Sequence, residues 1–515
     1  MKRKLATAHL LVMGAGMLAC SPEPSLPKNL RGIEKFDVVI RNGKVIDGSG
    51  SPGYLASIII QADTVAYIGQ LDSTRTATLE IDASGKVVTP GFIDAHAHGD
   101  PIKTPEFYNF VAQGVTTICL GQDGSSDSKG GFGAWQASVD SIGPALNIAP
   151  FTGHGSLRME TETPFEEELS EADMAMMTTE LDHQLRLGSF GLTMGLEYVP
   201  GRYSGRKELQ ALAKIVGSYQ GVLMAHIRNE DNDKLEASLD EFLSLGEWAP
   251  VHVSHLKSVY GEGTKRALEI ISILTKYESL GYRVSADVYP YMASFTGIGI
   301  VFPDWAIPPA NFNLVKKARR GELEEFLRNK IAQRNGPAAT LFGTAPYAGR
   351  TLADLEKELG KPFEDILIDD IGPRGASAAY FVMDDSLQEA LMTSDYVVVS
   401  SDGSPGMRHP RGYGSFGKMI ETYAVQGDYF TLEQVVHKMS GQTAEIIGLK
   451  GRGLLKVGYK ADVAIFDPAK VKVKADFQHP HHLTEGVDFV LVNGKLARNN
   501  GEFVEERNGS LLRRE

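Results

Sequence analysis

Residues Val87 to Asp100, VVTPGFIDAHAHGD, contain the clearest indication of the fold. The apolar residues Phe92 to Ala95 predict a buried strand that runs directly into His96 and His98. Side chains two residues apart on a strand point to the same side, so we expect the two imidazoles together at the strand's end. A catalytic zinc usually takes about three protein ligands and keeps a position for water. Other strand ends must therefore supply further ligands.

The central chain carries more apolar segments of strand length. The expected strands are 92–97, 115–121, 146–151, 189–195, 222–226, 250–255, 283–288 and 396–402. Helical stretches separate most of them and include 207–217, 233–245 and 264–279. Eight strands with helices between them predict an α/β chain folded as a (β/α)₈ barrel of the TIM type. A doubly wound sheet is the alternative, but it would not bring polar residues from so many strands to one point.

The regions outside the central chain have a different pattern. Residues 36–88 and 446–515 hold short strand segments separated by Asn-Gly, Gly-Ser or Ser-Gly turn signals. They predict one small β-sandwich-like domain built from both chain ends, around a barrel at 89–445. The segment 289–395 is too long for one crossover, which predicts an insertion at about 289–385 over the barrel mouth.

The start of the chain has the pattern of an export signal. Three cations at positions 2–4 precede an apolar run that ends in Met-Leu-Ala-Cys at Cys20. Residues 1–19 predict a signal peptide that is too short for a stable membrane span. The sequence before Cys20 resembles a bacterial lipobox, so we expect lipidation of Cys20, a tether at 20–35 and a membrane-anchored exported lipoprotein, in the outer membrane or periplasm. Plain secretory cleavage near Ala19 is the alternative.

The composition limits the possible partners. The chain has 515 residues and a formal net charge of −13, and loss of the three cations at positions 2–4 would take that charge to −16. An acidic exported protein is a poor binder of nucleic acid, so none is expected as a partner. The chain has two cysteines. If Cys20 is lipidated, only Cys119 remains and no intramolecular disulfide can form.

Polar residues follow several of the expected strands. Catalytic groups of a barrel gather at the carboxyl ends of its strands. One constellation is therefore expected, with room for one or two divalent metal ions. Its members are His96, His98, Asp123, His226, His255 and Asp402. A single histidine is more often structural, but chance rarely places a whole set at strand ends.

The order of these residues resembles the amidohydrolase superfamily, and the local motifs resemble its D-aminoacylase branch, the N-acyl-D-amino-acid deacylases. The motifs are PGFIDAHAHGD, GVTTICLGQDGSS, GHGSLR, GLTMGLEYVPG, HIRNE, VSHLK, DVYPY, SSDGSPG and HPRGYGSF. The resemblance covers about 37–501. It implies a barrel with a small β domain, zinc at the barrel mouth, and hydrolysis of an amide on a D-amino acid.

One position departs from the family pattern. At the end of the second strand the family usually has Gly-Asn-Cys-Gly, where this chain has Gly-Gln-Asp-Gly with Asp123 in the cysteine's place. A carboxylate is a harder donor than a thiolate and should loosen the selectivity for zinc, so another divalent metal is an alternative. Asp123 as a plain turn residue is the other interpretation. Cys119 lies within the strand and is expected to be a buried apolar residue.

Asp402 is expected to act as the general base that takes a proton from water and passes it to the leaving amine. The expected contacts to a small N-acyl amino acid or dipeptide substrate are Tyr198, Arg228, Lys257, Tyr289 and Arg411. Cations suit a free carboxylate, and the tyrosines can donate to a carboxylate or an oxyanion.

Other branches are less similar to this chain. Hydantoinases and dihydroorotases use a carbamylated lysine at the fourth strand, and residues 190–196 hold no lysine, which disfavours that branch. Alternatives are an isoaspartyl-dipeptidase-like or cyclic-amide hydrolase, or a non-catalytic solute-binding lipoprotein.

Overall fold

The computed structural model describes residues 26–126, 130–427 and 429–514. The predicted signal peptide and the predicted lipidation site Cys20 lie outside the described residues. Within them, no helix is long and apolar enough to cross a bilayer.

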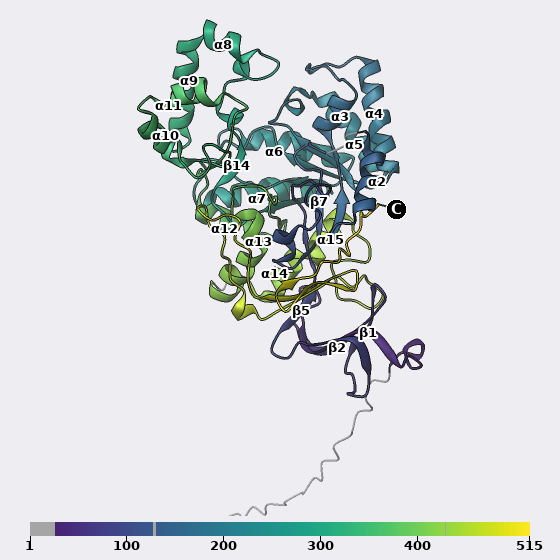
Figure 1. Cartoon of the computed structure of the whole chain (residues 1–515). Helices are drawn as coiled ribbons and strands as arrows, with labels where there is room; N and C mark the ends of the chain where they lie inside the picture. The colour runs from purple at the N-terminus through teal and green to yellow at the C-terminus, as the bar shows by residue number, and fades with distance from the viewer. Residues whose placement is uncertain (1–25, 127–129, 428, 515) are drawn as a thin grey trace, which may run out of the picture.

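Parallel strands form the centre of the molecule (Figure 1). In chain order they are β6 (Phe92–Asp94), β7 (Val115–Leu120), β8 (Asn147–Pro150) continued by β9 (Thr152–Gly153), β10 (Gly191–Gly195), β11 (Val222–His226), β12 (Val251–Val253), β13 (Val284–Val288) and β17 (Val397–Val399). A parallel bridge between Ala97 and Gly403 joins the first strand to the last. The amide of Asp402 also donates to the carbonyl of His96 across that join, at 2.8 Å. The eight predicted strands are confirmed, and they close into a barrel.

The barrel strands are buried on both faces, which is why they read as apolar runs without alternation; β7, for example, is buried throughout. Helices cover the outside of the barrel. They are α1 (Tyr108–Val111), α2 (Phe132–Ile142), α3 (His154–Glu160), α4 (Glu171–Arg186), α5 (Arg206–Ser218), α6 (Leu235–Leu243), α7 (Gly263–Ser279), α12 (Asp385–Thr393), α13 (Arg411–Lys418), α14 (Leu432–Met439) and α15 (Gly441–Ile447). In α5 the buried residues Leu209, Leu212, Ala213 and Val216 recur at helical spacing and form one apolar face.

Strands from both chain ends share one sheet. They are β1 (Lys35–Val45), β2 (Tyr54–Gln61), β3 (Thr64–Gly69), β4 (Thr76–Asp82), β5 (Val87–Pro90), β18 (Val463–Phe466), β19 (Val487–Val492), β20 (Lys495–Asn499) and β21 (Glu502–Phe503). The two halves meet where β5 pairs antiparallel with β18. Because β5 leads through Gly91 into β6, this sheet holds the first barrel strand, and with it His96, against the rest of the chain.

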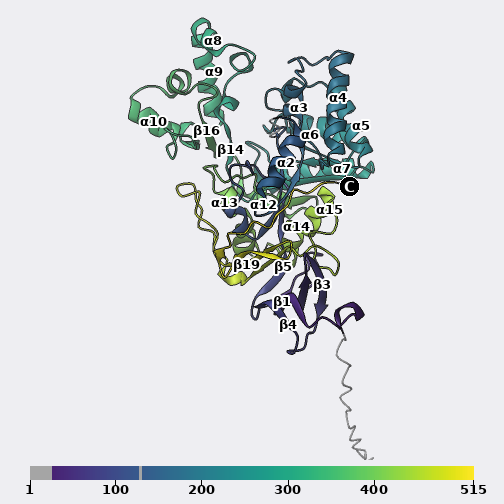
Figure 2. The ribbon, with the colours of Figure 1, turned by 45° about the vertical axis from the view of Figure 1, so that its right-hand side comes forward.

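The segment between β13 and β17 forms a separate layer. Its elements are β14 (Ser294–Gly297), α8 (Phe312–Ala318), α9 (Arg320–Gln333), β15 (Thr340–Phe342), α10 (Leu352–Leu359), α11 (Phe363–Asp365) and β16 (Ser377–Tyr380). The three strands form an antiparallel sheet, and the segment has an apolar core of its own that includes Leu327, Phe342 and Ile366. Figures 1 and 2 show this layer at the end of the molecule that lies opposite the terminal sheet, which is also the end where α3 and α4 lie.

Candidate metal centre and active site

Six predicted site residues lie at the carboxyl ends of five barrel strands. His96 and His98 follow β6, Asp123 follows β7, His226 ends β11, His255 follows β12 and Asp402 follows β17. Three of them have a left-handed backbone, with φ of 53° at Asp123, 36° at His255 and 47° at Asp402. Backbone strain of this kind costs roughly 1–3 kcal/mol per residue and clusters at functional sites. The backbone conformation at these strand ends therefore indicates a functional role in addition to the connection of strands to helices.

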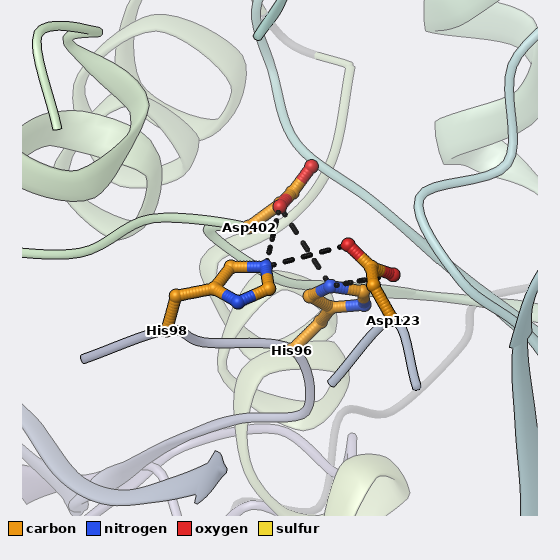
Figure 3. Close-up of side chains that lie close together, drawn as sticks. All are labelled: His96, His98, Asp123 and Asp402. Atoms are coloured by element: carbon orange, nitrogen blue, oxygen red, sulfur yellow. Dashed lines mark hydrogen bonds and ion pairs between the residues drawn. The ribbon is translucent and has the colours of Figure 1, made fainter. Parts of the chain in front are cut away.

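The first group of possible ligands comprises His96, His98, Asp123 and Asp402 (Figure 3). Their donor atoms lie within 4.8 Å of one another. Nε2 of His98 lies 3.1 Å from Oδ1 of Asp402 and 3.5 Å from Oδ2 of Asp123. Nε2 of His96 lies 3.4 Å from Oδ1 of Asp123 and 3.7 Å from Oδ1 of Asp402. Two imidazoles and two carboxylates thus face a common point.

The second group comprises Asp123, His226 and His255. Nε2 of His255 lies 3.2 Å from Oδ1 of Asp123 and 3.0 Å from Nδ1 of His226. Asp123 belongs to both groups, and the same oxygen faces His96 on one side and His255 on the other. This arrangement can hold one ion, or two ions that share the Asp123 carboxylate.

The hydrogen bonding of the cluster fits a cation. Both ring nitrogens of His96 are buried without a hydrogen-bond partner among the described residues. Burial lowers the pKa of His98, but the hydrogen bonds that its ring donates to Asp123 and Asp402, together with the charges of these carboxylates, raise that pKa to about 9. For His255, burial and Lys257 lower the pKa, but the charge of Asp123, its hydrogen bond with His255 and the charge of Asp402 together raise it to about 10. The carboxylates thus draw positive charge into the cluster, and a divalent metal can replace the protons on these imidazoles.

Two buried carboxylates hold the strand ends in place. Oδ1 of Asp94 accepts hydrogen bonds from the amides of His96, at 3.1 Å, and Ser401, at 3.0 Å. Oδ1 of Asp287 accepts from the amide of His255 at 3.0 Å, and its Oδ2 lies 2.8 Å from Nε2 of His252. Because these bonds join different strands, they fix the ligand-bearing turns relative to one another.

The structure adds two acidic residues that the sequence analysis did not select. Glu197 follows β10 and places Oε2 2.9 Å from Nε2 of His226. Oε1 of Glu230 lies 3.2 Å from Nδ1 of His255. With His226 the two form a third group with metal-ligand spacing. Both lie in motifs quoted above, LEYVPG and HIRNE, two and four residues beyond the expected strands 189–195 and 222–226, so a search of the loop residues after each strand would have found them.

The predicted substrate cations differ in what they contact. Nη1 of Arg411 lies 2.8 Å from Oδ2 of Asp402, while its Nε is buried without a partner among the described residues, so this side chain keeps a donor for another group. Nζ of Lys257 lies 2.6 Å from Oε1 of Glu230. Arg228 donates to Glu241 and to two backbone carbonyls. That engagement favours a structural role for Arg228 over the predicted substrate contact.

The two predicted tyrosines both face the site. The Tyr198 ring packs on His226 with centroids 4.5 Å apart, and its hydroxyl accepts from Thr296 at 3.2 Å. The Tyr289 ring centroid lies 4.6 Å from the guanidinium of Arg411, and this contact orients the guanidinium. Cys119 is buried within β7, and burial raises the pKa of its thiol well above the usual value, which suits the predicted apolar role.

Asp402 is ion-paired at both carboxylate oxygens. Oδ2 faces Arg411, and Oδ1 faces His98. Burial would raise the pKa of Asp402, but the charges of Arg411 and His255 and the hydrogen bond with His98 together hold it below the usual range. The carboxylate is therefore ionised at neutral pH and can accept a proton.

Three adjoining spaces surround these groups. The inner cavity has a volume of about 30 Å³, and residues around it include Asp123, His226, His255, Asp402, Arg411 and Arg334. A groove of about 670 Å³ runs from it along the insertion, past Ile300 and Trp305. A second groove of about 710 Å³ runs past His98 and the start of α3. Tyr198 and Thr296 border all three, so a molecule at the metal ligands can extend in two directions.

Known proteins share this architecture. A model described as "Amidohydrolase family" matches residues 351–497. An N-acyl-D-glutamate deacylase of Alcaligenes xylosoxydans xylosoxydans is 30% identical over 491 residues, covering 90% of this chain and 93% of that one. A D-aminoacylase of the same organism is 28% identical over 509 residues, covering 93% and 98%.

A crystal structure of N-acyl-D-glutamate deacylase from Bordetella bronchiseptica, complexed with zinc and a phosphonate inhibitor, matches with a TM-score of 0.82 at 28% identity. The match covers 93% of this chain and 100% of that one. It confirms the predicted barrel-type fold with its additional sheet-rich part. The chain belongs to the D-aminoacylase family of amidohydrolases.

Proposed function

We propose that this protein hydrolyses the amide bond of N-acyl-D-amino acids and that its active form contains zinc. The observation that carries the proposal is the gathering of four histidines and two aspartates in two groups that share Asp123, with both ring nitrogens of His96 unpartnered among the described residues. The relatives support the substrate class, since one is a D-aminoacylase and another an N-acyl-D-glutamate deacylase. The zinc in the Bordetella structure supports the choice of metal.

The histidines and Asp123 would hold the metal, either as one ion or as two. When bound there, the metal supplies Lewis-acid chemistry, polarising the amide carbonyl and lowering the pKa of water towards about 7. Asp123, in the cysteine's position, is a harder donor that accepts other divalent metals more readily than a thiolate would.

Asp402 carries the proton transfers. Its Oδ1 faces the cluster beside His98, so it can take the proton of the attacking water and deliver it to the leaving amine. Arg411 keeps this carboxylate ionised and fixes its orientation through Oδ2. Proton transfer by a positioned side chain contributes roughly 10²–10⁴-fold to the rate, so Asp402 accounts for a large share of turnover.

The α-carboxylate of the substrate has suitable donors next to these groups. Within the described part of the chain the buried Nε of Arg411 has no partner, and Lys257 reaches the same cavity. Because the α-carboxylate is separated from the amide nitrogen by a single carbon, its donors must lie beside the reacting groups, as these do. The Tyr198 hydroxyl borders the same space and can donate to the oxyanion that forms during attack.

A panel of N-acyl-D- and N-acyl-L-amino acids, with metal analysis of the same sample, tests the proposal. We expect turnover of D substrates that follows zinc content and disappears on chelation. Turnover only of isoaspartyl dipeptides or cyclic amides would establish one of the alternative hydrolases. Binding without turnover of any amide would establish a solute-binding protein.

Export as a lipoprotein anchored through Cys20 is part of the same proposal. Its support is the charged start, the apolar run and the Met-Leu-Ala-Cys sequence. Several acyl chains hold a protein firmly at a membrane, whereas one gives only weak attachment. Cys20→Ala should therefore release the protein from the membrane fraction, and continued attachment would contradict lipidation.

A further inference from the structure

Three cationic side chains line the inner cavity: Lys257, Arg334 and Arg411. Lys257 is neutralised by Glu230 at 2.6 Å, and Arg411 by Asp402 at 2.8 Å. Arg334 differs from both, because among the described residues no carboxylate lies within ion-pair distance of its guanidinium. It is nevertheless only 3% exposed.

Arg334 comes from the insertion, directly after α9. Its guanidinium lies over the Tyr380 ring, 4.5 Å from the centroid, and its Nε is buried without a hydrogen-bond partner in the described part of the chain. The Tyr260 hydroxyl lies nearby: burial raises the pKa of Tyr260 to about 12, against the opposing effect of Arg334. Rings thus position the guanidinium, but they do not neutralise it.

The acidic groups around the cavity already have other partners. Glu197 lies beside His226, Glu230 beside Lys257, and Asp231 beside Lys330 at 3.2 Å. A buried charge without a partner is costly, and a charge that faces a cavity is satisfied when an anion enters. The inner cavity adjoins the groove of about 670 Å³ along the insertion, since both are bordered by Tyr198, Asp231 and Ile300, so a ligand that enters beside Arg334 can extend beyond the inner cavity.

We propose that Arg334 binds a second carboxylate of the substrate, carried on its side chain, so that the enzyme selects N-acyl derivatives of dicarboxylic D-amino acids. The proposal rests on the proposed function. Arg334 takes the second carboxylate because Arg411 and Lys257 contact the catalytic cluster, whereas within the described residues no contact joins Arg334 to any candidate metal ligand. An acidic side chain of one or two methylenes can reach away from the reacting amide towards the insertion.

The test compares N-acetyl-D-glutamate with N-acetyl-D-glutamine, which has the same shape without the charge. The native enzyme should prefer glutamate in kcat/KM by roughly 10- to 100-fold, the usual worth of hydrogen bonds to a charged group. Arg334→Gln should remove most of that preference by raising KM for glutamate, with little change for glutamine. Arg334→Lys should restore part of it.

Arg328→Gln is the matched control, because it removes a cation from α9 that is half exposed and pairs with Glu364 outside the cavity. It should keep the native preference. Activity on the glutamine substrate shows that each variant folds. A native enzyme that hydrolyses both substrates equally, or an Arg334→Gln variant that keeps the preference, would overturn the role of Arg334 while leaving the proposed function intact. Failure of the native enzyme on every N-acyl-D-amino acid would overturn both.

Discussion

The strand ends of the barrel and the insertion differ in whether a buried charged side chain has a partner of opposite charge. At the strand ends the charged groups form one network, in which Asp402 faces Arg411 and His98, and His255 faces Asp123 and Glu230. The insertion instead presents Arg334, buried and unmatched among the described residues. Groups that perform the chemistry need a fixed geometry before substrate arrives. A group that selects the substrate can remain without an ion-pair partner in the free enzyme, because the substrate itself supplies that partner.

The largest effect should come from breaking the strand-end network at His255. This residue touches Asp123, His226 and Glu230, so His255→Ala removes a metal donor and the link between two ligand groups. We expect loss of zinc and a fall in kcat/KM of about a thousandfold or more, because metal-assisted polarisation is worth several kcal/mol.

Zinc stoichiometry and rate on the same preparation check this. His183→Ala, on the exposed face of α4, is the matched control and should keep both. Full activity of a chelated, metal-free preparation would end the metallohydrolase proposal.

Asp402→Asn separates proton transfer from metal binding. The amide keeps the shape of the side chain but cannot accept the proton, so kcat should fall by at least about a hundredfold, the usual scale for general acid–base catalysis. Zinc content should stay near the native value, since three other ligands of that group remain. An unchanged rate would show that another group is the base, with Glu230 and Glu197 the next candidates.

Substitutions of Asp123 test whether its carboxylate serves both groups of metal ligands. Asp123→Ala should weaken metal binding and lower turnover by about tenfold or more, as loss of metal-supporting groups commonly does. Asp123→Cys should keep the site assembled and tighten zinc, because a thiolate is the softer donor. A fully metallated and fully active alanine variant would leave Asp123 as a turn residue only.

The smallest effect concerns Lys438, a buried cation that pairs with no described carboxylate but is satisfied by the carbonyls of Ser394 and Val397, each 2.7 Å away. Burial lowers its pKa from the ordinary 10.5 to about 8. Between these values the unfolded chain binds more protons than the folded chain, so this residue's contribution to stability increases as pH rises from about 8 to 10.5.

The Tm of the native protein minus that of Lys438→Met should therefore grow by roughly 1–3 °C between pH 7.5 and 10. The same difference for Lys265→Met should stay constant, because the Lys265 side chain is 92% exposed. A constant difference for Lys438 would show that its burial carries no pH-dependent cost. It would also weaken the contrast with Arg334, for which the described residues provide no such carbonyl partners.

Much of the candidate site could be predicted from the order of residues alone. The eight strands follow from apolar runs of strand length, and His96, His98, Asp123, His226, His255 and Asp402 follow from their places at the ends of those runs. Parallel strands of a barrel all end at the same rim, so the topology brings together residues that are far apart in the chain. Glu197 and Glu230 were missed because both lie in loops beyond the expected strands, where acidic residues are common, and only their contacts with His226 and His255 place them at the site.

Which strands form and which polar residues end them can be predicted from the chain, because those features depend on the local hydrophobic pattern and on the two-residue repeat of a strand. Which charged side chains pair depends on the three-dimensional fold. Arg228 is engaged by Glu241, Arg411 by Asp402 and Lys257 by Glu230, while Arg334 reaches the cavity from the insertion and pairs with no described carboxylate. Ion pairing depends on distances between side chains from separate elements, and burial determines what an unpaired charge costs. No local pattern in the chain encodes either quantity.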